Sequence, residues 1–233
     1  MTNNKFTKIS EIGEFNLIRN LVQGIKTTQK STKMGIGDDA AVINFTKAKD
    51  HLISTDMLVE GVHFNPNYCP LKHVGYKAII VNISDICAMN GHATHALISL
   101  AIPTKYSVEL ITDLYSGIRL ACENYNIDLV GGDTTASTTG LIISITIIGE
   151  SKPNKTTYRS GAKPGDLLVV SGDLGGAYLG LQILERENTI FEQHQKSEPI
   201  LEQYSYILEK QLKPEARTDI IHKLDQLNIA PTS

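Results

Sequence analysis

Four short acidic clusters recur within the first 135 residues, each beside glycine or hydroxyl residues and next to an apolar run. They are Gly37-Asp38-Asp39-Ala40, Ser54-Thr55-Asp56, Asn82-Ile83-Ser84-Asp85 and Gly131-Gly132-Asp133-Thr134-Thr135. Carboxylates near the ends of strands and helices can converge in a fold although they are distant in sequence. Hard oxygen ligands with few imidazoles or thiols nearby suit Mg²⁺, which binds one or two carboxylates together with substrate phosphates. The clusters therefore predict a magnesium site and favour phosphate chemistry.

Some of these clusters also have a structural interpretation. Gly37-Asp38-Asp39 alone fits a plain turn, because glycine adopts unusual backbone angles and Asp bonds to its own backbone. Ser54-Thr55-Asp56 lies inside the apolar run 52–58, where an acidic residue is disfavoured unless it serves a site. Residues 131–140 are expected to form a loop whose backbone N–H groups bind a phosphate and its metal. A glycine loop by itself is weak support, so the combination carries the hypothesis.

Three further residues have two interpretations that the sequence leaves open. A lone histidine such as His63 is more often a structural hydrogen-bonding residue than a ligand contact. Arg159 is either a phosphate clamp or a solvated charge. Tyr115 belongs to a set of tyrosines that fits core packing, although it is also the one best placed for a nucleotide contact.

Hydrophobic periodicity predicts an alternation of strands and helices up to about residue 151. Asn82, Asp85 and Met89 share a face of one predicted helix, where an unpaired carboxylate is costly unless a metal ion satisfies it. The alternation indicates a mixed α/β or α+β domain. The predicted helices are 12–25, 71–89 and 108–125, and the predicted strands are 52–59, 95–102, 127–130 and 141–148.

A second region follows a linker-like stretch rich in proline and glycine at residues 153–165. It is predicted to contain one strand, 167–171, and then helices at 172–187, 200–211 and 215–227. We therefore divide the chain into residues 1–150 and 151–233.

The composition excludes several classes of protein. The chain has 233 residues, 41% of them hydrophobic, which is enough for a sizeable core. Its formal net charge is −3 and no long basic run occurs, so nucleic acid and anionic membrane surfaces are disfavoured as partners. The three cysteines form no Cys-x-x-Cys pair, which is typical of free thiols in a reducing compartment. No apolar stretch approaches the length of a membrane span. We expect a cytoplasmic globular protein.

Read in order, five motifs resemble the thiamine-monophosphate kinase family, whose superfamily includes aminoimidazole ribonucleotide synthetase and selenophosphate synthetase. The motifs are GIGDDAAV, ISTDMLVEGVHF, YKAIIVNISDICAMNG, LVGGDTT and RSGAKPGD. The resemblance runs from about residue 13 to the end. It implies ATP-dependent phosphorylation of thiamine monophosphate to thiamine diphosphate, by direct transfer, with several Mg²⁺ ions between the two substrates.

The resemblance also implies a role for each matching position, and no covalent nucleophile is expected among them. His63 would contact the thiamine-phosphate substrate. The residues that would contact ATP are Tyr115, Gly132, Asp133 and Arg159. The residues that would bind Mg²⁺ are Asp39, Ser54, Thr55, Asp56, Asp85 and Asp133.

The family fold implies an α+β N-terminal domain with a mixed sheet and flanking helices, which pairs with a second subunit into a dimeric barrel. It also implies an α/β C-terminal domain that is incomplete in residues 151–233, because the family continues into a Ser-Asp-Gly-Leu-type motif. We therefore expect a homodimer and weak turnover by these 233 residues alone. Two alternatives remain: another ATP-dependent enzyme of the superfamily acting on a different small molecule, or a non-catalytic dimeric fragment that binds nucleotide or metal.

Overall fold

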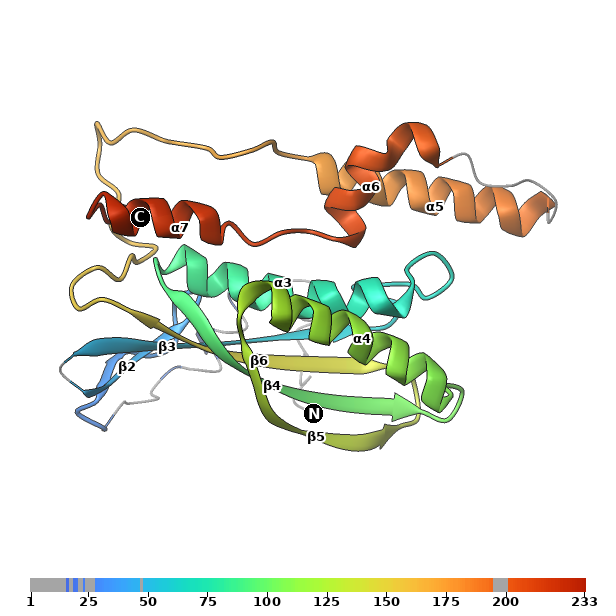
Figure 1. Ribbon diagram of the computed structural model, residues 1–233, viewed down its shortest axis with the longest axis horizontal. Coiled ribbons are helices and arrows are strands. Elements are labelled where there is room, and N and C mark those ends of the chain that lie inside the picture. The colour runs from blue at the N-terminus through green and yellow to red at the C-terminus, as the bar shows by residue number, and fades with distance from the viewer. Residues whose placement is uncertain (1–15, 17–18, 21–22, 24–27, 47, 195–200) are drawn as a thin grey trace, which may run out of the picture.

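A computed structural model describes residues 16, 19–20, 23, 28–46, 48–194 and 201–233 (Figure 1). Most of the helix predicted over residues 12–25 lies outside these residues. The described strands form one six-stranded sheet in the order β1-β2-β3-β6-β4-β5. All neighbours are antiparallel except β4 and β5, so the sheet is mixed, as predicted. The strands are β1 (Thr32–Met34), β2 (Ala41–Thr46), β3 (Lys49–Val59), β4 (His92–Pro103), β5 (Asp128–Ser137) and β6 (Ile142–Ser151).

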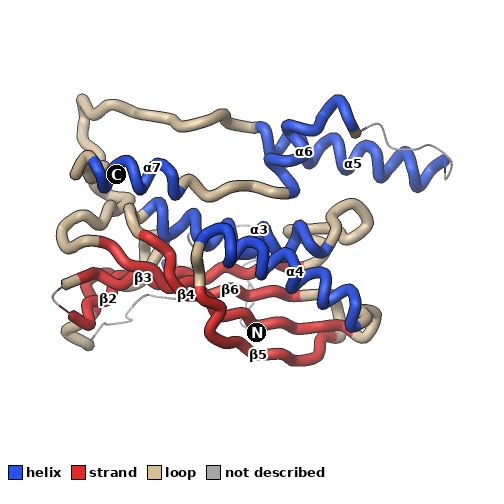
Figure 2. Tube along the Cα trace, in the orientation of Figure 1, coloured by secondary structure: helices blue, strands red, loops and turns tan. Residues whose placement is uncertain are grey.

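Two helices cover one face of the sheet, α3 (Leu71–Ala88) and α4 (Val108–Tyr125) (Figures 1 and 2). Because side chains alternate along a strand, every second residue of β6, including Ile143, Ile145 and Ile147, is fully buried against this helical layer. The other face of the sheet carries the exposed side chains. This alternation decides which residues of β3 can meet α3.

The C-terminal helices lie on the side of α3 that faces away from the sheet (Figure 1). They are α5 (Gly176–His194), the short 3₁₀ helix η1 (Glu202–Tyr204), α6 (Ser205–Leu212) and α7 (Thr218–Gln226). Since α3 lies between two layers, it buries apolar residues around most of its circumference, among them Val74, Ile80, Ile83 and Ile86. A helix enclosed in this way holds its polar residues in fixed positions. No helix among the described residues is long and apolar enough to cross a membrane.

Helices α3 and α4 approach each other through two glycines. A Cβ added at Gly75 would lie 2.1 Å from the carbonyl oxygen of Leu114, and one at Gly117 would lie 1.8 Å from the carbonyl oxygen of Lys72. The absent side chains allow backbone-to-backbone contact between the helices.

Two sequence predictions about strands were wrong. The loop predicted at residues 131–140 is instead largely strand, because β5 continues to Ser137 and pairs with β4 along its length. Gly132 lies opposite Ile98, and a Cβ there would meet the Ile98 carbonyl oxygen at 1.8 Å, so this glycine reflects close strand packing rather than a turn.

The strand predicted at residues 167–171 does not form either. This apolar segment pairs with no strand among the described residues, and Leu167 and Leu168 are 90% and 96% exposed. A strand needs a neighbour to accept its hydrogen bonds, and periodicity alone does not supply one. The predicted helices of the C-terminal region correspond to α5, α6 and α7.

Candidate active site

The centre of the site is a contact between β3 and α3. Ser54 points from β3 towards the helical layer, and its hydroxyl donates a 2.6 Å hydrogen bond to an oxygen of Asp85 on α3. Burial raises the pKa of the Asp85 carboxyl, and the negative charges of Asp56 and Asp39 raise it further, while the Ser54 hydrogen bond and Arg159 act in the opposite direction. Asp39, Asp56 and Arg159 therefore act electrostatically on Asp85.

Asn82 holds the backbone at Asp56. Strand β2 pairs with β3 only as far as Ile53, so the Asp56 N–H has no partner on that side in any strand that the structure describes. The Asp56 N–H donates to Oδ1 of Asn82 at 3.0 Å, and Nδ2 of Asn82 donates to the Ala78 carbonyl at 2.9 Å. Because Asn82 is fully buried, α3 fixes both Asp56 and Asp85.

The two adjacent aspartates at positions 38 and 39 have different partners. Asp38 accepts hydrogen bonds from the Asp39 N–H at 3.0 Å and from the Arg159 N–H at 3.1 Å. Asp39 instead forms an ion pair with the guanidinium of Arg159, and this contact raises the pKa of Arg159 above its ordinary value. Asp38 therefore holds the backbone, and Asp39 offers a charge to the site.

The donor set fits a hard divalent cation. The carboxylates of Asp39, Asp56 and Asp85 and the hydroxyl of Ser54 provide oxygen ligands only, which is the chemistry that Mg²⁺ prefers. Burial, and after it the charges of Asp56 and Asp39, disfavour the ionised form of Asp85, and a bound cation would favour that form. Within the part of the chain that the structure describes, no three such side chains already meet in a ligand arrangement. The ion pair with Arg159 compensates one of these charges.

Two of the residues expected at the metal lie elsewhere in the single chain. Thr55 points to the opposite face of the sheet from Ser54, where its hydroxyl donates to the Ile145 carbonyl at 3.0 Å and accepts from Thr146 at 3.1 Å. Asp133 lies on β5, three strands from β3, in a row that runs through Ser99 and Ser144 to Met57. That row spans about 14 Å at the usual strand spacing. The fold thus gathers Asp39, Ser54, Asp56 and Asp85, and leaves Thr55 and Asp133 apart.

His63 ends a tight turn directly after β3. The Val59 N–H donates to Nδ1 of His63 at 3.0 Å, and the His63 N–H donates back to the Val59 carbonyl at 2.9 Å. Since Nδ1 accepts a hydrogen bond, the neutral ring carries its proton on Nε2, which is a donor for an incoming anion. The ring borders a cavity of about 170 Å³ that Tyr68, Lys77 and Glu185 also line. Burial lowers the pKa of Lys77 in this cavity.

Tyr115 lines a groove of about 410 Å³ at the start of α4. The groove is mostly apolar and includes two aromatic rings, Tyr106 and Tyr115, with Arg119 at its edge. A flat apolar surface beside a cation is suited to a purine base and its phosphates. Gly132 lies on β5 and does not line this groove.

Sequence reasoning gave no separate role to Asn82 or Asp38, although both hold the site together. The available signal for Asn82 was its place one helical turn before Asp85 on the same predicted face. For Asp38 no local signal existed, because its partner at position 159 is distant in sequence.

Residues 37–151 match the family model described as AIR synthase related protein, N-terminal domain. The thiamine-monophosphate kinase of Bacillus subtilis is 35% identical over 207 residues, covering 89% of this chain and 61% of its own length. That of Aquifex aeolicus is 36% identical over 219 residues, covering 94% of this chain and 65% of its own. The chain belongs to the thiamine-monophosphate kinase family.

Solved structures of the family have the same fold. The structure described as AaThiL complexed with AMPPCP and TMP superimposes on this chain with a TM-score of 0.79 and 33% sequence identity, covering 95% of this chain and 65% of the other. The chain therefore spans about three fifths to two thirds of the length of the family members that it matches. The region matched by the family model, residues 37–151, contains every predicted site residue except Arg159.

Proposed function

We propose that the protein transfers the γ-phosphoryl group of ATP directly to thiamine monophosphate and so forms thiamine diphosphate. The observation that carries this proposal is the Ser54–Asp85 hydrogen bond, together with the electrostatic effect of Asp39, Asp56 and Arg159 on the same Asp85 carboxyl. Phosphoryl transfer needs positioning and charge neutralisation more than a covalent nucleophile. A relative with the same fold is complexed with AMPPCP and TMP, an ATP analogue and the proposed acceptor.

The residues of this chain divide the task. Asp39, Ser54, Asp56 and Asp85 would hold Mg²⁺, which when bound neutralises the charge that the phosphates bring together. Arg159 would leave Asp39 to bind ATP phosphate, and Tyr115 would contact the base. On the other side, Nε2–H of His63 would donate to the phosphate of the acceptor.

We further propose that the protein is a homodimer whose two sheets close into a barrel. Among the described strands, β5 lies at an edge of the sheet and all but its last residue is exposed, and residues 54–59 of β3 have no described strand neighbour on the β2 side. The face of the sheet away from the helices exposes Met57 and Leu97. Exposed edges and apolar faces are normally covered in native proteins. Thr55, Gly132 and Asp133 would then act from this face or edge, next to the second subunit.

The division into residues 1–150 and 151–233 belongs to the same proposal, and the matched region 37–151 supports its boundary. A cytoplasmic location is proposed from the cysteines, since Cys69, Cys87 and Cys122 are free and buried.

The test is an assay of purified protein with Mg²⁺, γ-labelled ATP and thiamine monophosphate, with product identified by chromatography. We expect label in thiamine diphosphate, loss of transfer when Mg²⁺ is chelated, and no labelled protein. Thiamine and other phosphate-bearing small molecules serve as competing acceptors. Preferred transfer to one of these would favour another enzyme of the superfamily, and nucleotide binding without any transfer would favour a non-catalytic role.

A further inference from the structure

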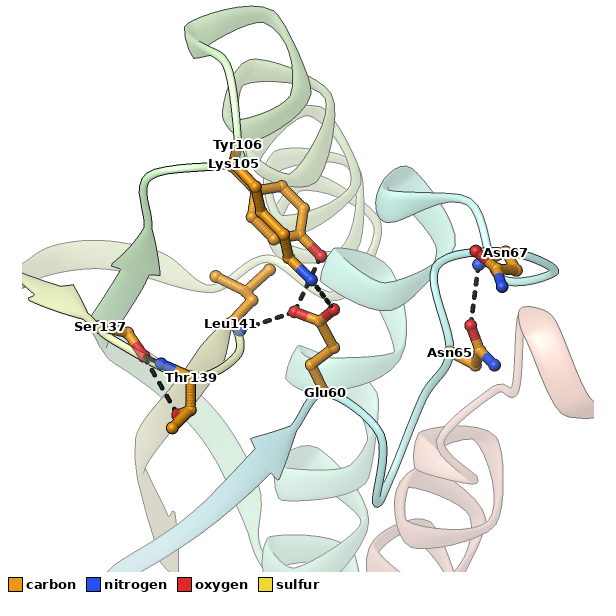
Figure 3. A network of polar contacts seen from close by, with 8 residues as sticks. All are labelled: Glu60, Asn65, Asn67, Lys105, Tyr106, Ser137, Thr139 and Leu141. Carbon is orange, nitrogen blue, oxygen red and sulfur yellow. Dashed lines mark hydrogen bonds and ion pairs between the residues drawn. The ribbon is translucent and has the colours of Figure 1, made fainter.

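Glu60, the first residue after β3, joins three segments that are distant in sequence (Figure 3). One carboxylate oxygen accepts hydrogen bonds from the Leu141 N–H at 2.8 Å and from the Tyr106 hydroxyl at 3.1 Å. The other oxygen is paired with the ammonium of Lys105. The carboxylate is nearly buried, with its side chain 11% exposed. Both carboxylate oxygens of Glu60 are therefore occupied by contacts within the protein.

The charge state of this cluster agrees with its geometry. Burial opposes ionisation of Glu60, but the hydrogen bonds from Leu141, Lys105 and Tyr106 together lower the pKa of its carboxyl below the ordinary value. Burial, together with Glu60, raises the pKa of Tyr106 to about 12. At neutral pH the pair is thus a carboxylate accepting from a protonated phenol, which is a charge-assisted hydrogen bond.

Glu60 lies between two parts of the candidate site. Tyr106 and Tyr115 both line the groove at the start of α4, which we call the nucleotide groove because the proposed function assigns it to the base of ATP. On the other side, Glu60 begins the turn that ends in His63, and this turn is closed by the Gly61 N–H donating to the Phe64 carbonyl at 2.8 Å.

The backbone of Glu60 is held as firmly as its side chain. Its N–H donates to the Leu141 carbonyl at 2.9 Å, so residues 60 and 141 bond to each other through both backbone and carboxylate. Gly140 allows this close approach, because a Cβ there would lie 3.1 Å from Cβ of Glu60. The carboxylate thus has one fixed position relative to the end of the sheet.

We infer that Glu60 is a positioning residue that fixes the nucleotide groove, through Tyr106, relative to the turn carrying His63. It contacts neither substrate. This role rests on the proposed function, since it assumes that the groove takes the base of ATP and that His63 faces the acceptor. Loss of the carboxylate should weaken binding of both substrates while leaving the transfer step itself nearly intact.

The experiment is a double-mutant cycle on the purified protein, with Glu60→Gln, Tyr106→Phe and the double variant. The dissociation constant for Mg²⁺-AMPPCP is measured by calorimetry well below the melting temperature of each variant. We expect each single substitution to weaken binding about tenfold, the scale of one hydrogen bond to a charged group. The double variant should be no weaker than the weaker single variant, because both changes remove the same contact. Glu123→Gln, which changes an exposed residue in the last turn of α4, is the matched control.

Steady-state kinetics separates positioning from general stability. In Glu60→Gln we expect KM for ATP and for thiamine monophosphate to rise by about tenfold, and kcat to stay within about threefold. Unchanged Kd and KM in the folded variants, or additive effects in the cycle, would overturn the inference. If the unsubstituted protein binds no nucleotide, the proposed function fails and this inference with it. If the unsubstituted protein binds the nucleotide and the variants bind it equally well, only the inference about Glu60 fails.

Discussion

Arg159 and Asp39 form an ion pair across 120 residues of sequence, which joins the start of the C-terminal region to the segment before β2. The family resemblance assigns Arg159 to ATP and Asp39 to Mg²⁺. In the free protein the two residues therefore neutralise each other, and under the proposed roles binding of the metal-nucleotide would separate them. The Arg159 side chain is about half exposed, so water screens the pair and the separation costs little.

Replacing Arg159 with Ala should have opposite effects on the two ligands. Mg²⁺ alone should bind about two- to fivefold more tightly, because Asp39 loses its competing cation, whereas ATP should bind more weakly through loss of a phosphate contact. Calorimetric titrations with MgCl₂ and with Mg²⁺-AMPPCP measure both constants. Arg217→Ala, which removes a different exposed arginine paired with Asp219, is the control. Parallel weakening of both ligands would contradict the competition.

Replacing Asp85 with Asn should lower Mg²⁺-dependent turnover by at least about 10²-fold without unfolding the protein. The pKa of Asp85 is raised in the folded state, so its ionised form costs stability at neutral pH, and that cost disappears as the pH falls below the folded pKa. Asn is neutral and still accepts a hydrogen bond from Ser54, so the melting temperature of the metal-free protein should be unchanged or higher.

Asp56→Asn should lose turnover in the same way. Asp128→Asn, at the exposed start of β5, is the control. Full activity in Asp85→Asn would remove this residue from the metal site.

Replacing His63 with Ala should weaken binding of thiamine monophosphate about tenfold and binding of ATP much less, since Nε2–H is proposed to donate to the acceptor phosphate. His63→Asn distinguishes the ligand contact from the turn. Its side-chain oxygen can take the place of Nδ1 and accept from the Val59 N–H, but it has no donor at the position of Nε2. Separate titrations with the two substrates decide the matter. Restoration of acceptor binding by Asn would show that His63 acts only by holding the turn.

Replacing Asp50 with Asn should destabilise the fold in a pH-dependent manner. Asp50 is buried, and although burial opposes its ionisation, contacts with Lys33, Asn44 and Thr156 lower its pKa below 3.8. A carboxyl with a lowered folded-state pKa contributes stability above its unfolded pKa and loses it as the pH falls through the folded value. Urea unfolding of both proteins should show a difference of about 1–3 kcal/mol at pH 7 that is lost as the pH falls through the folded-state pKa of Asp50. A difference that stays constant across this range would refute the electrostatic cause.

Replacing Gly117 with Ala should lower the free energy of unfolding by about 1–3 kcal/mol, because the new methyl group forces α4 away from α3. The control is Gly131→Ala, since a Cβ at Gly131 meets no atom within 4 Å. Chemical denaturation of the two variants measures the difference. Equal stability in the two would show that the helices can separate without cost.

The sequence by itself determined the elements with a regular apolar period and the positions of the acidic motifs. Strand β3 and helices α3 and α4 follow from local spacing, because which residues share a face depends only on the geometry of one helix or strand. The same spacing placed Asp85 and Asn82 on one face of α3. Ordered motifs were sufficient to identify the family before any fold was known.

Only the tertiary structure decided which residues meet. Whether residues 131–135 form a loop or a strand depends on pairing with β4, and the apolar segment 167–171 stays without a strand neighbour among the described residues. The contacts of Ser54 with Asp85 and of Arg159 with Asp39 join residues 31 and 120 positions apart. Strand register also separated Thr55 from its neighbours Ser54 and Asp56, because adjacent residues of a strand point to opposite faces. Such relationships depend on pairing and packing between distant segments, which local periodicity does not encode.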